Sequence, residues 1–124
     1  MNSVNEKTVI IVDDTGFMRK KLKKVLEQSG YRVVHECEDG SEIVDAYQKH
    51  HPDFVTMDIV MPKMDGITAV KSLLEVDENA KVIMVSSLGL ENKVMEAARA
   101  GASSFILKPF SPEELIAVIE SVLN

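Results

Sequence analysis

The heptapeptide Thr-Val-Ile-Ile-Val-Asp-Asp, residues 8–14, is the segment from which the fold class is most directly inferred. Its first part is an unbroken run of β-branched residues, and two aspartates follow directly. A strand that is covered by helices on both faces needs no alternation of apolar and polar residues, so this run predicts an interior strand of a parallel sheet. The aspartates then lie beyond the carboxyl end of that strand, which is where open α/β sheets bind their ligands.

The rest of the chain repeats this arrangement, because short β-rich runs alternate with longer stretches of helical period. Such alternation predicts βαβ units, and hence an α/β fold with a doubly wound, five-stranded parallel sheet. The expected strands are Thr8–Val12, Val33–Cys37, Phe54–Met57, Lys81–Ser86 and Ser104–Leu107. The expected helices are Gly16–Ser29, Ser41–His50, Gly66–Val76, Glu91–Ala100 and Pro112–Leu123.

Local signals mark several helix ends. Gly30 and Gly101 follow helical stretches and suit C-terminal caps. Ser41 with Glu42 suits a helix N-terminus, and so does Ser111 with the Pro-Glu-Glu that follows it.

Length and composition bound the organisation of the chain. With 124 residues and 45% apolar content, it can bury one continuous core but not two, so we expect a single domain over residues 1–124 with no output domain. Cys37 is the single cysteine, so no internal disulfide can form. We expect Cys37 to be a small core residue. We find no signal peptide and no apolar run that could cross a bilayer, so we expect a cytoplasmic protein that does not enter the membrane.

The formal net charge of −6 argues against DNA or RNA as the main partner, because nucleic-acid affinity depends largely on Lys and Arg neutralising phosphates. One predicted helix is locally basic. The simpler interpretation of this helix is a solvated basic face opposite an apolar one. The basic residues are Arg19, Lys20, Lys21, Lys23 and Lys24, and the apolar residues are Phe17, Met18, Leu22, Val25 and Leu26.

Chemically useful side chains stand where three further strands end: Asp58, Ser86 and Lys108. Together with Asp13 and Asp14, Asp58 offers hard oxygen ligands, and three carboxylates in one place repel each other unless a cation such as Mg²⁺ neutralises them. An aspartate beside such a metal is also a plausible nucleophile toward phosphorus, through an acyl phosphate. Lys108 and the Ser86 hydroxyl suit the oxygens of a transferred phosphoryl group.

A structural explanation competes at each position. An isolated aspartate after a strand is most often a helix N-cap, and an isolated lysine or serine there is usually solvated. Capping explains one of Asp13 and Asp14 but poorly explains both. Because all these residues fall at one edge of the predicted sheet, a shared site is the better account.

The motifs Val12-Asp13-Asp14, Met57–Pro62 with Met64-Asp65-Gly66, Val85-Ser86-Ser87 and Phe105–Phe110 resemble, in this order and spacing, a receiver domain of two-component response regulators. The resemblance covers essentially the whole chain. It implies the flavodoxin-like strand order 2-1-3-4-5. It further implies a phosphoacceptor that takes part in its own phosphotransfer and is not an enzyme.

The resemblance also implies a role for each site residue. Asp58 would accept a phosphoryl group from a histidine kinase, and Ser86 and Lys108 would hold its oxygens. Mg²⁺ would be bound by Asp13, Asp14, Asp58 and the backbone carbonyl of Val60. Phe105 would occupy the aromatic switch position, and the Lys108-Pro109 peptide would be cis.

Among receivers, the chain is most similar to single-domain chemotaxis regulators. This similarity implies a CheA-like kinase and the flagellar motor switch protein, or another target, as partners. A single-domain phosphorelay intermediate or a phosphate sink would share the same active site, so these alternatives stay open. A flavodoxin-like cofactor binder is disfavoured by the aspartates and the scarcity of aromatic residues, and a Mg²⁺-dependent phosphohydrolase by short loops that leave little room for a substrate pocket.

Two departures from the family pattern bear on signal lifetime. Val60 and Leu88, two residues after Asp58 and Ser86 respectively, are apolar where family members often carry polar side chains. Apolar groups cannot orient an attacking water, so we expect slow spontaneous dephosphorylation and a partner phosphatase.

Phe105 lacks the hydroxyl of the commoner tyrosine, so a switch here must work by burial and packing.

Overall fold

The computed structural model describes residues 6–124, so residues 1–5 of the expected domain lie outside the described residues. The strands are β1 (Thr8–Val12), β2 (Arg32–Cys37), β3 (Phe54–Met57), β4 (Val82–Ser86) and β5 (Ser104–Leu107). The helices are α1 (Gly16–Gln28), α2 (Ile43–His50), α3 (Gly66–Val76), α4 (Glu91–Ala100) and α5 (Pro112–Leu123), with a short 3₁₀ turn η2 (Gly40–Glu42) before α2.

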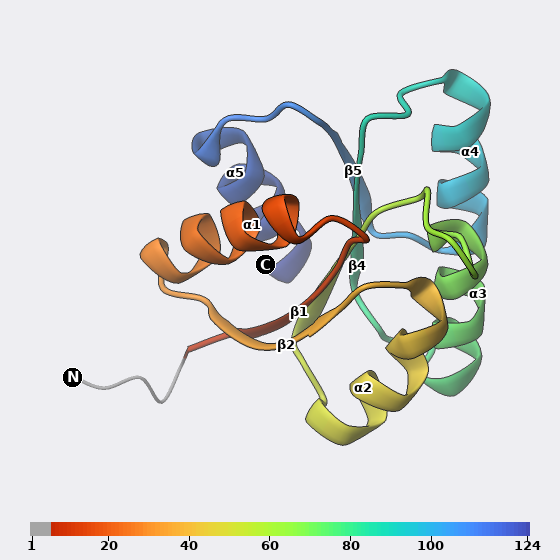
Figure 1. The fold of residues 1–124 in the computed structure, drawn as a ribbon, viewed down its shortest axis with the longest axis horizontal. Helices are drawn as coiled ribbons and strands as arrows, with labels where there is room; N and C mark the ends of the chain where they lie inside the picture. Colours follow the sequence, from red (N-terminus) through yellow and green to blue (C-terminus); the bar gives the residue numbers. More distant parts are fainter. Residues whose placement is uncertain (1–5) are drawn as a thin grey trace.

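The strands form one parallel sheet in the order β2-β1-β3-β4-β5, which confirms the expected fold and strand order. Helices α1 and α5 cover one face, and α2, α3 and α4 cover the other (Figure 1). Because all strands run the same way, the carboxyl ends of β1, β3, β4 and β5 meet at one edge.

Apolar side chains pack on both faces of the sheet. One cluster includes Ile10, Val55 and Met84 with residues of α2, α3 and α4. The other includes Ile11, Phe54 and Ile83 with residues of α1 and α5. Every residue of β3 and β4 is buried, as their nearly continuous apolar character predicts. Cys37 is fully buried, as expected for a core residue.

Most helix ends follow their sequence signals. Gly30 and Gly101 adopt positive φ of 93° and 106° just after α1 and at the end of α4. Ser111 caps α5 in a capping box with Glu114. The prediction at Ser41 was wrong: Asp39 caps a 3₁₀ turn there, and α2 begins only at Ile43.

Phe17 also differs from its prediction as part of the apolar face of α1. Its side chain is 80% exposed, whereas Leu22 and Leu26 are buried. Phe17 precedes Leu22 by five positions, about 140° around an α-helix, and therefore lies off the buried stripe. Among the described residues, no helix is long and apolar enough to span a membrane.

Candidate functional site

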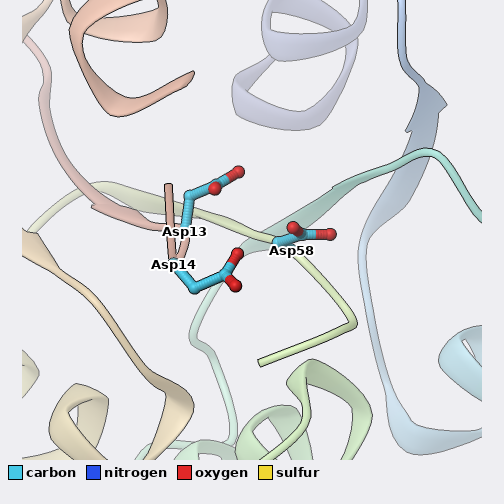
Figure 2. A group of neighbouring side chains, drawn as sticks. All are labelled: Asp13, Asp14 and Asp58. Atoms are coloured by element: carbon cyan, nitrogen blue, oxygen red, sulfur yellow. The ribbon is translucent and has the colours of Figure 1, made fainter. Parts of the chain in front are cut away.

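Three aspartates gather at the carboxyl edge of the sheet. Asp13 and Asp14 follow β1, and Asp58 follows β3. Each offers a carboxylate oxygen that lies within 4.8 Å of the others (Figure 2). Asp13 and Asp58 are buried, and Asp14 is exposed. The structure therefore brings together the acidic residues that the sequence singled out.

Lys108, directly after β5, is the positive charge inside this cluster. Its Nζ donates to Asp13 Oδ2 at 2.8 Å and to Asp58 Oδ2 at 3.3 Å. Burial alone would lower the pKa of Lys108, but the hydrogen bond to Asp13 and the charge of Asp58 outweigh it and raise that pKa. The lysine therefore stays charged. The expected cis Lys108-Pro109 bond is present.

The surroundings of Asp58 disfavour its charged form. Burial raises the pKa of Asp58 and the charge of Asp13 raises it further, while Lys108 partly offsets both effects. One oxygen also accepts the backbone N–H of Ile59 at 2.7 Å. A carboxylate held charged against desolvation gains strongly from a nearby cation, so Asp58 is suited to metal binding and to nucleophilic chemistry.

The turn after β1 is braced from two sides. Asp13 Oδ1 accepts both the N–H and the hydroxyl of Thr15, and Thr15 in turn caps α1. Arg19 donates through Nη1 to the Asp13 carbonyl at 2.7 Å, and its Nε lies 3.3 Å from Glu36 of β2. Thr15 and Arg19 therefore fix the segment that presents Asp13 and Asp14.

The other predicted residues lie around the same edge. Ser86 ends β4 and is buried, and its Oγ accepts the N–H of Leu88 at 3.1 Å. The Phe105 side chain of β5 is half-buried and packs against the apolar cluster that includes residues of α2, α3 and α4. Val60 is 58% exposed, and it lines a groove with Leu88 between the β3–α3 loop and α4.

Sequence reasoning missed several polar interactions near the site. Arg19 was assigned only to a solvated face, and Asp39, which accepts three backbone N–H groups, was not singled out. These contacts join loops to other elements, so residue spacing does not reveal them; the Asp-Gly pair at 39–40 before a helix was the one available signal.

The donor set fits Mg²⁺. Three carboxylates supply hard oxygens, and one of them is exposed, which leaves room for the water ligands that Mg²⁺ retains. The buried, partly uncompensated charge of Asp58 and Asp13 is what a divalent cation would neutralise.

The fold and the site together define a flavodoxin-like α/β domain with an acidic, metal-compatible pocket and a lysine at the carboxyl edge of its sheet. Comparison with known proteins identifies its family. Residues 9–120 match the response regulator receiver domain, and the chain belongs to this family.

Its relatives include chemotaxis proteins. The chain is 46% identical to the chemotaxis protein CheY of Bacillus subtilis over 116 residues, covering 94% of this chain and 97% of that protein. CheY of Thermotoga maritima matches with the same identity and coverage. A chain in the crystal structure of the CheX-CheY-BeF₃-Mg²⁺ complex from Borrelia burgdorferi superposes with a TM-score of 0.92 at 40% identity, covering 95% of this chain and 90% of that one. The protein is thus a response regulator receiver domain closely related to CheY.

Proposed function

We propose that this protein is a stand-alone response regulator in which Asp58 accepts a phosphoryl group from a CheA-like histidine kinase. Phosphorylation would switch its affinity for a target, which we propose to be a flagellar motor switch protein, in the cytoplasm. The observation that carries the proposal is the convergence of three carboxylate oxygens within 4.8 Å, with Lys108 in contact with two of the carboxylates.

The chemistry follows from these positions. A carboxylate oxygen of Asp58 attacks phosphorus, the phosphorus–nitrogen bond of the donor phosphohistidine breaks, and the ring, already protonated on its other nitrogen, leaves as neutral imidazole. Mg²⁺, held by Asp13, Asp14, Asp58 and the Val60 carbonyl, would supply positive charge to the phosphoryl oxygens. Lys108 then exchanges its contact with Asp58 for a phosphoryl oxygen, and the Ser86 hydroxyl donates to another.

The switch would use Ser86 and Phe105. The Ser86 Oγ accepts a hydrogen bond from the N–H of Leu88. Movement of this hydroxyl toward a phosphoryl group would break that bond and change the start of the β4–α4 loop. Phe105 is half-buried and lines a small cavity with Val94 and Ala97 of α4, and we propose that its ring turns inward there on phosphorylation. Phosphorylation acts only to the extent that it favours one arrangement of these groups over the other.

A partner phosphatase is the second part of the proposal. Val60 and Leu88 line the groove beside the site with apolar side chains, and neither of these two side chains can orient an attacking water. The solved complex of a related CheY with CheX supports the existence of a partner protein for this chain.

The phosphoacceptor assignment is tested by labelling with a small phosphodonor and with candidate kinases. Wild-type protein should take up one phosphoryl group in the presence of Mg²⁺, and Asp58→Asn should take up none. Asp53→Asn, at the opposite edge of the sheet, is the matched control and should label normally. Retained labelling of Asp58→Asn would overturn the assignment, and repeated turnover of a phosphate ester would favour a phosphohydrolase instead.

The coupling role of Lys108 needs a separate experiment. We expect Lys108→Ala to keep Mg²⁺ binding largely intact, because the lysine supplies no metal ligand. The variant should lose the difference in partner affinity between phosphorylated and unmodified protein. Phosphotransfer profiling against candidate kinases, followed by a pull-down of both forms, identifies the partners and separates a chemotaxis regulator from a phosphorelay intermediate or sink.

A further inference from the structure

A single buried carboxylate, Asp39, anchors the loop that joins β3 to α3. Asp39 follows β2 and is 5% exposed. Its Oδ1 accepts the backbone N–H of Lys63 at 2.9 Å, and its Oδ2 accepts those of Met64 at 3.1 Å and Ser41 at 2.9 Å. We propose that Asp39 is a positioning residue for the metal site: by fixing this loop it places the Val60 carbonyl and sets the affinity for Mg²⁺. This inference rests on the proposed function.

The loop is tied at three places, and Val60 lies between them. At its neck, the N–H of Gly66 donates to the Ile59 carbonyl at 2.8 Å. In its first half, the Met61 side chain is buried in the core. At its apex, Asp39 holds two consecutive N–H groups. The Val60 side chain is exposed and packs too little to fix its own peptide, so the position of its carbonyl depends on these neighbouring ties.

The backbone on both sides is shaped for this contact. A Cβ added at Gly40 would lie 2.6 Å from the Met64 carbonyl oxygen and 2.9 Å from the Ala69 Cβ. Only glycine permits the chain after Asp39 to approach the loop so closely. The Asp39-Gly40 corner and the Lys63-Met64 apex are therefore packed as one unit.

The effect of the Asp39 charge on Mg²⁺ affinity must be separated from its effect on the position of the loop, because Asp39 also lines an acidic groove beside Asp14. Burial alone would raise the pKa of Asp39, but hydrogen bonds from the Lys63, Ser41 and Met64 backbones lower it to about 2. Its fixed negative charge attracts cations whether or not it positions the loop. Glu38 offers the matched control: it lines the same groove, and its carboxylate accepts no hydrogen bond from the described residues.

The experiment compares Asp39→Asn, Asp39→Ser and Glu38→Gln by two measurements. Amide hydrogen exchange at Lys63 and Met64 in Mg²⁺-free protein reports the anchor, and calorimetric titration with Mg²⁺ alone reports the affinity. Serine is a good N-cap and keeps an acceptor for Ser41, but its shorter side chain cannot serve both loop N–H groups. Asp39→Ser therefore tests the positioning role of Asp39 even if Asp39→Asn does not fold.

We expect both Asp39 variants to speed exchange at the two amides and to raise the Kd for Mg²⁺ by about tenfold, the lower end of the effect of outer-shell partners on metal affinity. Glu38→Gln should leave exchange unchanged and shift the Kd by less than about twofold, because an exposed charge is screened. Equal Kd values for the Asp39 and Glu38 variants, or fast exchange with unchanged Kd, would overturn the positioning role. Failure of wild-type protein to bind Mg²⁺ would instead overturn the proposed function itself.

Discussion

At the scale of single residues, Lys108 determines the charge balance of the site. Its ammonium contacts two buried carboxylates, Asp13 and Asp58, and its charge offsets part of the rise that burial and the Asp13 charge cause in the pKa of Asp58. Without a metal, one positive charge faces the three aspartates, so the pocket retains a net negative charge. With Mg²⁺ bound the formal charges cancel, and a phosphoryl group makes the pocket negative again. Phosphorylation is therefore a large local change of charge, as a switch requires.

The apolar side chains at Val60 and Leu88 lead to a prediction for the lifetime of the phosphorylated protein. We expect Val60→Asn and Leu88→Glu to shorten it, by about tenfold or more, because a polar group beside the site can orient an attacking water. The measurement is the decay of phosphorylated protein with Mg²⁺ and no partner. The exposed Val76, at the far end of α3, gives a control variant, Val76→Asn, whose lifetime should match wild type. A lifetime that neither substitution shortens would count against shielding by these residues.

Asp39 leads to a prediction for the pH dependence of stability. Its folded-state pKa of about 2 lies below the ordinary value of 3.8, so it stabilises the fold above pH 3.8 and this contribution is lost as the pH falls toward 2. Asp39→Asn should therefore lower the free energy of unfolding at neutral pH, by roughly 1–3 kcal/mol for the lost charge-assisted hydrogen bonds. Urea unfolding of both proteins from neutral to acidic pH should show the difference narrowing below pH 3.8. A difference that stays constant over this range would contradict the prediction.

At the scale of elements, the sequence predicted strands better than the start of α2. Strands β3 and β4 are buried on both faces, so their apolar runs coincide with the observed bounds to within one residue. Helix α2 begins later than predicted, because Asp39 caps the preceding turn while also holding residues of the β3–α3 loop. That second task depends on a contact distant in sequence, which local capping rules do not capture.

Gly66 and Gly16 are the first residues of two helices at the same edge of the sheet, and we expect their replacement by alanine to have very different effects on stability. A Cβ at Gly66, the first residue of α3, would lie 1.9 Å from the Asp58 carbonyl oxygen, whereas one at Gly16, the first residue of α1, meets only Arg19 Nη2 at 3.5 Å. We expect Gly66→Ala to displace the backbone of Asp58, to destabilise the protein by about 3 kcal/mol, as overpacking does, and to slow labelling. Gly16→Ala should change stability by less than about 1 kcal/mol.

Urea unfolding and labelling by a small phosphodonor measure both glycine variants. Normal stability and labelling in Gly66→Ala would show that the β3–α3 loop moves to make room for the added Cβ at little cost in free energy. That result would contradict the tight packing of α3 against the phosphoacceptor.

The central strand contains a polar atom without a partner. The Oγ1 of Thr56 in β3 is buried and makes no hydrogen bond within the described part of the chain. Valine has nearly the same shape and no hydroxyl to desolvate, so Thr56→Val should stabilise the protein by about 1 kcal/mol. The measurement is the urea midpoint at unchanged m-value. Thr68→Val is the contrasting variant and should destabilise, because the Thr68 hydroxyl donates to Asp65. Equal or lower stability of Thr56→Val would indicate that this hydroxyl has a partner in solution.

At the scale of the whole molecule, the candidate site was predictable because parallel strands bring their carboxyl ends to one edge. Asp13, Asp58, Ser86 and Lys108 each stand at or just after a strand end, so topology alone places them together. The residues that hold them were not predictable in this way. Arg19 donates to the carbonyl of Asp13, and Asp39 accepts amides of a loop, and each contact depends on how a helix or turn packs against the sheet.

The same convergence links metal binding to global stability. Asp13 and Asp14 follow β1 and Asp58 follows β3, so a cation held among them ties two strands together and is lost on unfolding. Wild-type protein should therefore gain RT ln(1 + [Mg²⁺]/Kd), about 2.7 kcal/mol at a Mg²⁺ concentration of 100 Kd, measured by urea unfolding with and without Mg²⁺. Asp14→Asn removes an exposed ligand that makes no hydrogen bond among the described residues, so it should keep its metal-free stability but gain much less from the same Mg²⁺ concentration. Asp53→Asn, remote from the site, should gain as much as wild type. An equal gain in Asp14→Asn and wild type would place the bound cation elsewhere and remove Asp14 from the metal site.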